Sequence, residues 1–301
     1  MMADKITLDQ ISTQSRYDLC DLYDQDATDV DVIESPYASI KNTCGYYDPG
    51  NVKILLNDTH CSLSLFCLNT QGLRALWDGF TELIENINGN TCFSSLDIIG
   101  LTELYSMTHD SCKLDGYHPL HFKIRNDMQS SRGGVGMYIK ENIKHNIRED
   151  LSIFIPHIFE SIFIEIFTHN KSIIIGTIYR PNTPPKADLD IFMHTIMELQ
   201  TTLQTENKDI YIMGDININL LQFSDHAKTN DYLDNTFSLG FIPLITKPTR
   251  VTPYSATLID HIYTNKQLID TTSGIIISDV SDHFGVFTIV NSTQRKKRYQ
   301  P

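Results

Sequence analysis

The stretch DIYIMGDIN at residues 209–217 joins an apolar run of β-strand composition to an abrupt polar end. Its first six residues favour a strand that is buried on both faces. Asp215 and Asn217 follow that strand at once. Polar groups that flank a buried strand lie at the rim of its sheet, so this stretch predicts a strand that presents a carboxylate and a carboxamide to such a rim.

The same β-rich texture recurs along the chain and alternates with amphipathic stretches. Apolar residues at helical spacing mark 73–87, 189–203 and, more weakly, 232–237. This alternation predicts an α/β fold, a four-layer sandwich in which two packed mixed β-sheets are flanked by helices. The other expected strands are 61–68, 97–102, 135–140, 161–168, 172–179, 258–264, 274–278 and 285–290.

Length and charge limit the function classes that remain. The 301 residues are 41% hydrophobic, which excludes a disordered tail or a bare coiled coil. The net charge of −13 does not attract polyanions to the whole surface, so any contact with nucleic acid must be local. We expect three segments: an acidic, poorly ordered leader at 1–55, one domain at 56–291, and a basic tail at 292–301.

Cysteine usage and the chain ends bear on the compartment. The six cysteines form no CxxC pair or regular framework, so we expect reduced thiols. The first residues lack a signal-peptide pattern, and no apolar run approaches the roughly 18 residues of a membrane span. We therefore expect an intracellular chain without a membrane partner. The terminal RKKR at 295–298 is compatible with a nuclear location.

One apolar run after another ends on a polar side chain. Desolvating several neighbouring carboxylates is unfavourable unless a cation compensates them. Oxygen ligands of this kind suit Mg²⁺, or Mn²⁺, and the absence of clustered Cys and His argues against zinc. The candidate site residues are Asn69, Glu103, Tyr179, Asp215, Asn217, Asp260, Asp282 and His283.

Six short motifs occur in a telling order. They are LN at 68–69, TE at 102–103, IYRP at 178–181, GDIN at 214–217, IDH at 259–261 and SDH at 281–283. This set resembles the endonuclease/exonuclease/phosphatase superfamily over residues 60–291. Within it the chain is most similar to the endonuclease domain of LINE-type, non-LTR retrotransposon polyproteins. That narrower similarity is carried by RGGVGMYI at 132–139, ITKPTRVTPYSATLIDHIYTN at 245–265 and ISDVSDHFGV at 277–286.

The resemblance implies a metal site and a set of catalytic roles. Glu103 would bind the metal, with Asn69 and Asp282 completing or supporting the shell. Whether one or two metals act stays open, as does the identity of the general base, for which Asp215 is our choice. Asn217 would hold the water or a phosphate oxygen, and Tyr179 would donate a hydrogen bond to the phosphate. His283, oriented by Asp260, would stabilise the negative charge that grows on the phosphate oxygens.

The loop 246–258 corresponds to a hairpin that resembles the DNA-contacting element of LINE endonucleases. Lys247, Arg250 and Tyr254 are therefore candidates for nucleic-acid binding, with a solvated surface loop as the alternative. Arg125 and Arg132 are further candidates for phosphate contacts.

The motifs together predict a metal-dependent phosphodiesterase. The resemblance implies that it nicks DNA to leave 3′-hydroxyl and 5′-phosphate ends, with DNA as the partner and no obligatory protein partner. Two alternatives stay open. One is a phosphomonoesterase or small-substrate phosphodiesterase on the same scaffold, which the charge of −13 mildly favours. The other is an inactive, domesticated DNA-binding module, in which case DNA would be retained in a salt-sensitive way without turnover.

Overall fold

The structure is a computed structural model of the whole chain, and it describes residues 44–57, 61–89, 95–108, 111–125, 132–168, 171–182, 186–266 and 271–291. Two seven-stranded sheets, a small hairpin and four α-helices make up this part of the chain. The helices are α3 (Pro49–Leu56), α4 (Trp77–Asn88), α5 (Lys186–Thr205) and α6 (Ala227–Ser238), and a short 3-10 helix spans Leu220–Gln222.

The first sheet has the order β1-β15-β16-β2-β3-β5-β4. Strands β2 and β3 are parallel, and α4 lies on the connection between them, as a parallel pair requires. All other pairs except β1–β15 are antiparallel, so the sheet is mixed. The bounds are β1 (Cys44–Tyr47), β2 (Cys61–Asn69), β3 (Ile98–Thr102), β4 (His121–Lys123), β5 (Val135–Ile139), β15 (Thr271–Ile276) and β16 (Gly285–Asn291).

The second sheet has the order β11-β14-β10-β9-β8-β6, and β7 pairs with β8 beside this path. Its parallel pair is β9–β10, and α5 forms the crossover between the two strands. The bounds are β6 (His145–Ile147), β7 (Phe154–Ile155), β8 (Phe159–Phe167), β9 (Ser172–Tyr179), β10 (Asp209–Asp215), β11 (Ile242–Pro243) and β14 (Asp260–Thr264). Strands β12 (Arg250–Thr252) and β13 (Ser255–Thr257) form the separate hairpin.

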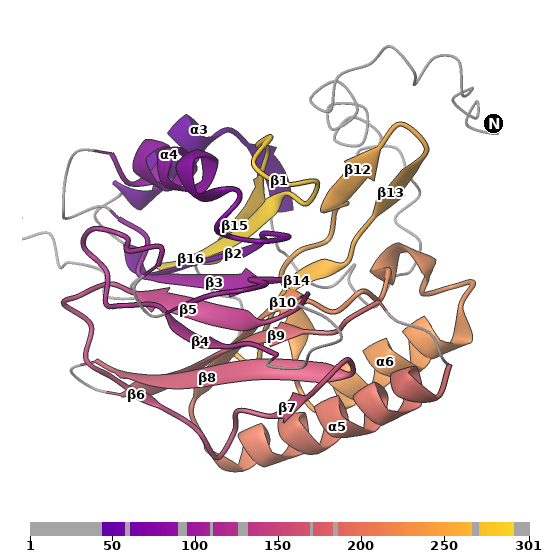
Figure 1. Cartoon of the computed structure of the whole chain (residues 1–301). Helices are drawn as coiled ribbons and strands as arrows, with labels where there is room; N and C mark the ends of the chain where they lie inside the picture. The colour runs from indigo at the N-terminus through magenta and orange to yellow at the C-terminus, as the bar shows by residue number, and fades with distance from the viewer. Residues whose placement is uncertain are drawn as a thin grey trace, which may run out of the picture.

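The two sheets pack face to face, with α3 and α4 over the first and α5 and α6 over the second (Figure 1). The central strands β3, β9 and β10 are apolar on both faces because each face is covered, by the other sheet or by helices. Gly100 in β3 lets the sheets approach: an added Cβ would lie 2.5 Å from Thr177 Oγ1 and 2.6 Å from Met213 Cε. The expected four-layer α/β sandwich is confirmed.

All nine expected strands and the three expected helices are present, but the expected leader was placed too far along the chain. Residues 44–56 form β1, which pairs in parallel with β15, and α3, whose Val52 and Leu56 are buried. The prediction that residues 44–55 are poorly ordered is therefore wrong, because this short polar-looking segment completes a sheet edge. The rest of the expected leader, 1–43, and the basic tail, 292–301, lie outside the described residues.

Among the residues with assigned structure, none of the helices combines the length and the apolar composition that a bilayer crossing requires.

Candidate active site

The carboxyl ends of both parallel strand pairs meet at one rim of the sandwich. Asn69 ends β2, Glu103 follows β3, Tyr179 ends β9 and Asp215 ends β10. Asp215 stands opposite Tyr179 across one ladder and opposite Asp260, the first residue of β14, across the other. Strand register thus brings side chains from distant parts of the sequence to one place, as the strand ends in the sequence predict.

Asn69 connects the two sheets at this rim. Its Nδ2 donates hydrogen bonds to Glu103 Oε1 at 2.9 Å and to Asp215 Oδ2 at 2.8 Å. Its Oδ1 accepts from the backbone N–H of Gln71 at 3.1 Å. The amide nitrogen therefore holds the two carboxylates in place, while the role of Asn69 as a metal ligand through its oxygen stays a prediction.

Asp215 is a buried carboxylate with a strongly altered proton affinity. Burial, and then the negative charge of Asp260, raise its pKa from 3.8 to about 7. The charge of His283 and hydrogen bonds from Asn217 and Asn69 act in the other direction and lower this pKa. The backbone N–H of Asn217 donates to Asp215 Oδ1 at 2.9 Å, and its Nδ2 donates to Oδ2 at 3.1 Å. The carboxylate can therefore take up or release a proton near neutral pH.

Gly214 explains why the motif reads Gly-Asp. Its φ is +145°, and an added Cβ would lie 1.8 Å from the carbonyl oxygen of Ile178 on the neighbouring strand. Only glycine allows this approach of β9 and β10 directly before Asp215.

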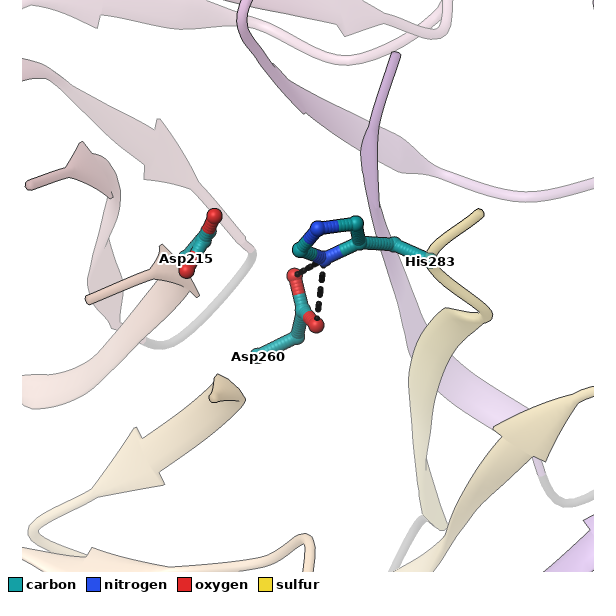
Figure 2. A group of neighbouring side chains, drawn as sticks. All are labelled: Asp215, Asp260 and His283. Atoms are coloured by element: carbon teal, nitrogen blue, oxygen red, sulfur yellow. Dashed lines mark hydrogen bonds and ion pairs between the residues drawn. The ribbon is translucent and has the colours of Figure 1, made fainter. Parts of the chain in front are cut away.

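Asp260 and His283 form a buried pair beside Asp215 (Figure 2). His283 Nδ1 lies 2.9 Å and 3.1 Å from the two Asp260 oxygens, and Thr249 Oγ1 donates to Asp260 Oδ2 at 2.7 Å. Burial alone would lower the pKa of His283, but the Asp260 carboxylate outweighs it, and the pKa is raised to about 9. The imidazole is accordingly cationic at neutral pH, with Nδ1 held by Asp260 and Nε2 left to donate elsewhere.

Glu103 sits in the left-handed backbone region, with φ at +54°. Its Oε2 accepts a hydrogen bond from the Tyr105 hydroxyl at 2.9 Å. Burial and the Glu103 charge raise the pKa of Tyr105 to about 12, and burial and Glu103 also raise that of Tyr179. Two neutral phenols thus flank this carboxylate. A non-glycine residue held at positive φ beside other polar groups is typical of functional sites.

Asp282 lies at the outer edge of the group and meets the hairpin. Its Oδ2 accepts from Arg250 Nε at 2.9 Å and from an Arg250 terminal nitrogen at 2.6 Å. Its Oδ1 lies 3.8 Å from His283 Nε2, and its charge raises the pKa of Tyr105. Asp282 therefore lies near both His283 and Tyr105, and its role in supporting the metal shell stays a prediction.

The three residues expected to bind nucleic acid occupy different positions. Arg250 is engaged with Asp282, and the ammonium of Lys247 lies 5.6 Å above the Tyr46 ring. Tyr254, in the turn between β12 and β13, is 77% exposed. The hairpin projects from the sandwich (Figure 1), so Tyr254 is the residue of the three that is open to a large partner.

Comparison with known proteins places the chain. Residues 68–283 match the endonuclease/exonuclease/phosphatase family. The chain belongs to this family. A search of the curated proteins gives no significant match. The family match begins one residue before Asn69 and ends at His283, so it spans the whole set of expected site residues.

Solved structures of the family share the fold at low sequence identity. The endonuclease domain of TRAS1, a telomere-specific non-LTR retrotransposon, superposes with a TM-score of 0.54 at 13% identity, covering 76% of this chain and 97% of that one. The APE2 catalytic domain from Xenopus laevis gives 0.56 at 17% identity, with coverages of 77% and 94%. The 3′ phosphatase NExo from Neisseria, bound to a product DNA hairpin, gives 0.52 at 15% identity, with coverages of 77% and 100%.

The residues at this rim fit the divalent metal that the family typically uses. Ligand atoms of Asp215, Asp260 and His283 lie within 4.8 Å of one another, and all three residues are buried. Burial and then the negative charge of Asp260 raise the pKa of Asp215, and a nearby cation would favour its ionised form. The sequence resemblance assigns the ion to Glu103, with Asp282 in support. This assignment stays a prediction, because Asp282 is paired with Arg250 just as Asp260 is paired with His283. Oxygen donors of this type suit Mg²⁺.

Three residues that act at the site were not among the candidates from the sequence. Thr249 and Tyr105 orient Asp260 and Glu103, and Arg180 donates to the carbonyl oxygens of Ile216 and Asn217, both at 2.6 Å. Arg180 belongs to the quoted IYRP motif, so its position could have marked it. Arg125 is a correction to the phosphate-contact expectation, because its guanidinium is buried in an ion pair with Glu160.

Proposed function

We propose that the chain is a metal-dependent DNA endonuclease of the non-LTR retrotransposon type, which nicks a strand to leave 3′-hydroxyl and 5′-phosphate ends. The observation that carries the phosphodiesterase chemistry is the buried Asp215, with a pKa of about 7, beside an Asp260–His283 pair that keeps the imidazole cationic. A base that titrates near neutral pH and a fixed cationic donor are what hydrolysis of a phosphate ester needs.

Each residue of the site has a separate role in the in-line attack of water on the phosphate. Asp215 accepts the proton of the attacking water, and Asn217 beside it holds that water or a phosphate oxygen. His283 donates from Nε2 to the phosphate as negative charge grows on its oxygens, and Asp260 fixes the ring through Nδ1. The neutral hydroxyl of Tyr179 donates to the same phosphate.

Mg²⁺, or Mn²⁺, would be held by Glu103 and Asp282, with Asn69 in support. When bound, the ion supplies Lewis-acid stabilisation of the phosphate and of the leaving oxygen. Asn69, Tyr105 and Arg250 keep the two carboxylates oriented toward the rim.

DNA is supported as the substrate by the hairpin beside the site. Arg250 links the hairpin to Asp282, and Tyr254 stands at its exposed turn. An aromatic side chain on a projecting hairpin can enter a groove or stack on a base, while the arginine lies close to the phosphate. The sequence similarity of 245–265 to LINE endonucleases points the same way.

Nicking of supercoiled plasmid in Mg²⁺ tests this proposal. We expect wild-type protein to nick, and Asp215→Asn and His283→Gln to lose at least about 100-fold in rate while remaining folded. Asp234→Asn, an exposed carboxylate on α6, is the matched control and should nick like wild type. Nicked product that serves as a primer for a DNA polymerase without prior phosphatase treatment would identify the 3′-hydroxyl end.

A phosphomonoesterase or small-substrate phosphodiesterase is the second candidate, and the net charge of −13 favours it because the surface as a whole repels DNA. The same preparations are assayed for phosphate release from a chromogenic phosphomonoester. Phosphate release by wild type without plasmid nicking would replace the nuclease proposal with this one. Salt-sensitive DNA binding with neither activity would instead indicate a DNA-binding module that has lost catalysis.

A further inference from the structure

A second group of potential ligands lies away from the strand ends described above. The strands β4 and β6 are the edges of the first and second sheets, on the same side of the sandwich. His121 begins β4 and His145 begins β6, and their Nε2 atoms are 3.1 Å apart. His118 packs against His145 with ring centroids 5.0 Å apart. The fold thus clusters three histidines that the sequence spreads over two segments.

The hydrogen bond of His145 determines which of its ring nitrogens carries the proton and which has the free lone pair. Its Nδ1 lies 3.2 Å from the backbone carbonyl oxygen of Ile143, which can only accept, so Nδ1 carries the proton. In the neutral ring, Nε2 then presents a lone pair to His121. A ring nitrogen whose opposite N–H is tied to a carbonyl is the usual state of a metal-ligating histidine.

The spacing of the two nitrogens matches shared coordination. Two ligands at about 2.0–2.1 Å from a tetrahedral zinc lie ~3.3 Å from each other. The observed 3.1 Å is close to that edge length. A hydrogen bond between the rings accounts for the same distance, and the test below separates the two.

The surroundings suit a cation bound by neutral imidazoles. The histidines line an open cavity of about 420 Å³ that also includes Lys123 and Glu149. The Lys123 ammonium pairs with Glu149 at 2.7 Å, so its charge is compensated. The ring nitrogens of His118 make no hydrogen bond to a described residue, so no such bond opposes the side-chain rotation that His118 needs in order to act as a ligand.

We propose that His121 and His145, with His118 as the third imidazole, bind a divalent transition-metal ion such as Zn²⁺ between the edges of the two sheets. Imidazole nitrogens select zinc, copper, nickel or cobalt over Mg²⁺, so this site differs in chemistry from the carboxylate site at the strand ends. The ion joins β4 to β6 and closes the sandwich at an edge where no backbone ladder connects the sheets. It is a structural site, and it does not depend on the proposed nuclease activity.

The test uses the full chain with Co²⁺ as the probe and excess Mg²⁺ present to occupy the carboxylate site. We expect one equivalent of Co²⁺ to give saturable visible absorption and to raise the melting temperature. His121→Gln and His145→Gln should abolish both effects, and His118→Gln should weaken binding about tenfold. His194→Gln, on the exposed face of α5, is the matched control and should behave like wild type.

A second measurement on wild type guards against unfolded variants. Bound Co²⁺ should shift the imidazole proton resonances of His121 and His145 far outside their normal range, and should leave those of His194 in place. Equal Co²⁺ binding by wild type and His121→Gln, or no saturable binding by wild type, would overturn the proposal in favour of a simple hydrogen bond between the two rings. Plasmid nicking by the same wild-type preparation reports separately on the proposed function.

Discussion

The carboxylate of Asp260 controls two neighbouring titrations. Burial and then the Asp260 charge raise the pKa of Asp215 to about 7, and the Asp260 charge outweighs burial to raise the pKa of His283 to about 9. Hydrolysis needs Asp215 deprotonated and His283 protonated, so we expect a bell-shaped pH–rate profile between these values. Asp260→Asn removes the charge that raises both pKa values, and both limbs of the profile should move to lower pH, by about 1 unit or more. Rates measured from pH 5 to 10 on a small phosphodiester check this, and opposite movements of the two limbs would contradict it.

Some residues of the candidate site could be predicted from the sequence, and others could not. Asp215, Asn217 and Glu103 were predictable because each directly follows a buried apolar run, which fixes its place at the rim. Tyr105 was not, because its hydroxyl reaches Glu103 through a backbone at φ +60°, a conformation that no local pattern indicates. Thr249 could not be predicted either, because it orients Asp260 from 11 residues away, across the β12–β13 hairpin.

At the scale of elements, the β9–β10 pair depends on Gly214. A Cβ there would overlap the Ile178 carbonyl at 1.8 Å, so Gly214→Ala must push the two strands apart beneath Asp215. We expect a loss of about 2–4 kcal/mol in the free energy of unfolding, with activity lost as well. Gly79→Ala in α4 is the control, because its Cβ meets only Val280 at 3.8 Å and should stabilise the helix by about 0.5–1 kcal/mol. Urea unfolding of both variants measures the difference.

Strand β1 and helix α3 could not be predicted from the composition of their segment. The segment 44–56 lies beside an acidic stretch and has little periodicity, yet β1 adds an edge strand to β15 and Tyr47 packs edge-on against Phe287. The two chains to compare are one that begins at residue 44 and one that begins at residue 57. A chain that begins at residue 57 should unfold at lower temperature and aggregate, because it exposes the β15 edge. Thermal unfolding and light scattering compare the two, and equal stability would contradict the assignment of β1 to the domain.

We expect the β12–β13 hairpin to contribute to activity on DNA and not to activity on small substrates. Tyr254 is exposed at its turn and touches none of the expected catalytic residues in the described contacts. Tyr254→Ala should therefore reduce plasmid nicking by about tenfold or more, through the loss of stacking worth ~1–3 kcal/mol. Hydrolysis of a small phosphodiester should be unchanged by the same substitution. A parallel loss in both assays would place Tyr254 in the fold rather than in DNA binding.

The buried titratable groups make the stability of the whole molecule depend on pH. The pKa of Asp215 is about 7 in the folded chain against 3.8 ordinarily, so its folded form binds the proton more tightly. Its contribution to stability is full below about pH 4 and is lost as the pH rises to 7. His283, raised from 6.5 to about 9, likewise contributes fully below pH 6.5 and loses that contribution as the pH approaches 9. Without metal, these two groups together make the chain less stable in alkali than in mild acid.

Replacing the buried charge should reverse part of this loss while removing catalysis. We expect Asp215→Asn, measured without metal, to melt several degrees above wild type at pH 8, at roughly 2–4 °C per kcal/mol for a chain of this size. The gain should nearly vanish near pH 3, where Asp215 is largely protonated in both states, and Asp234→Asn should show no pH-dependent gain. Calorimetry at the two pH values decides this: an equal effect at both would mean that Asp215 is not charged in the folded protein at pH 8. A gain confined to high pH would show that the group proposed as the catalytic base is kept at the expense of stability.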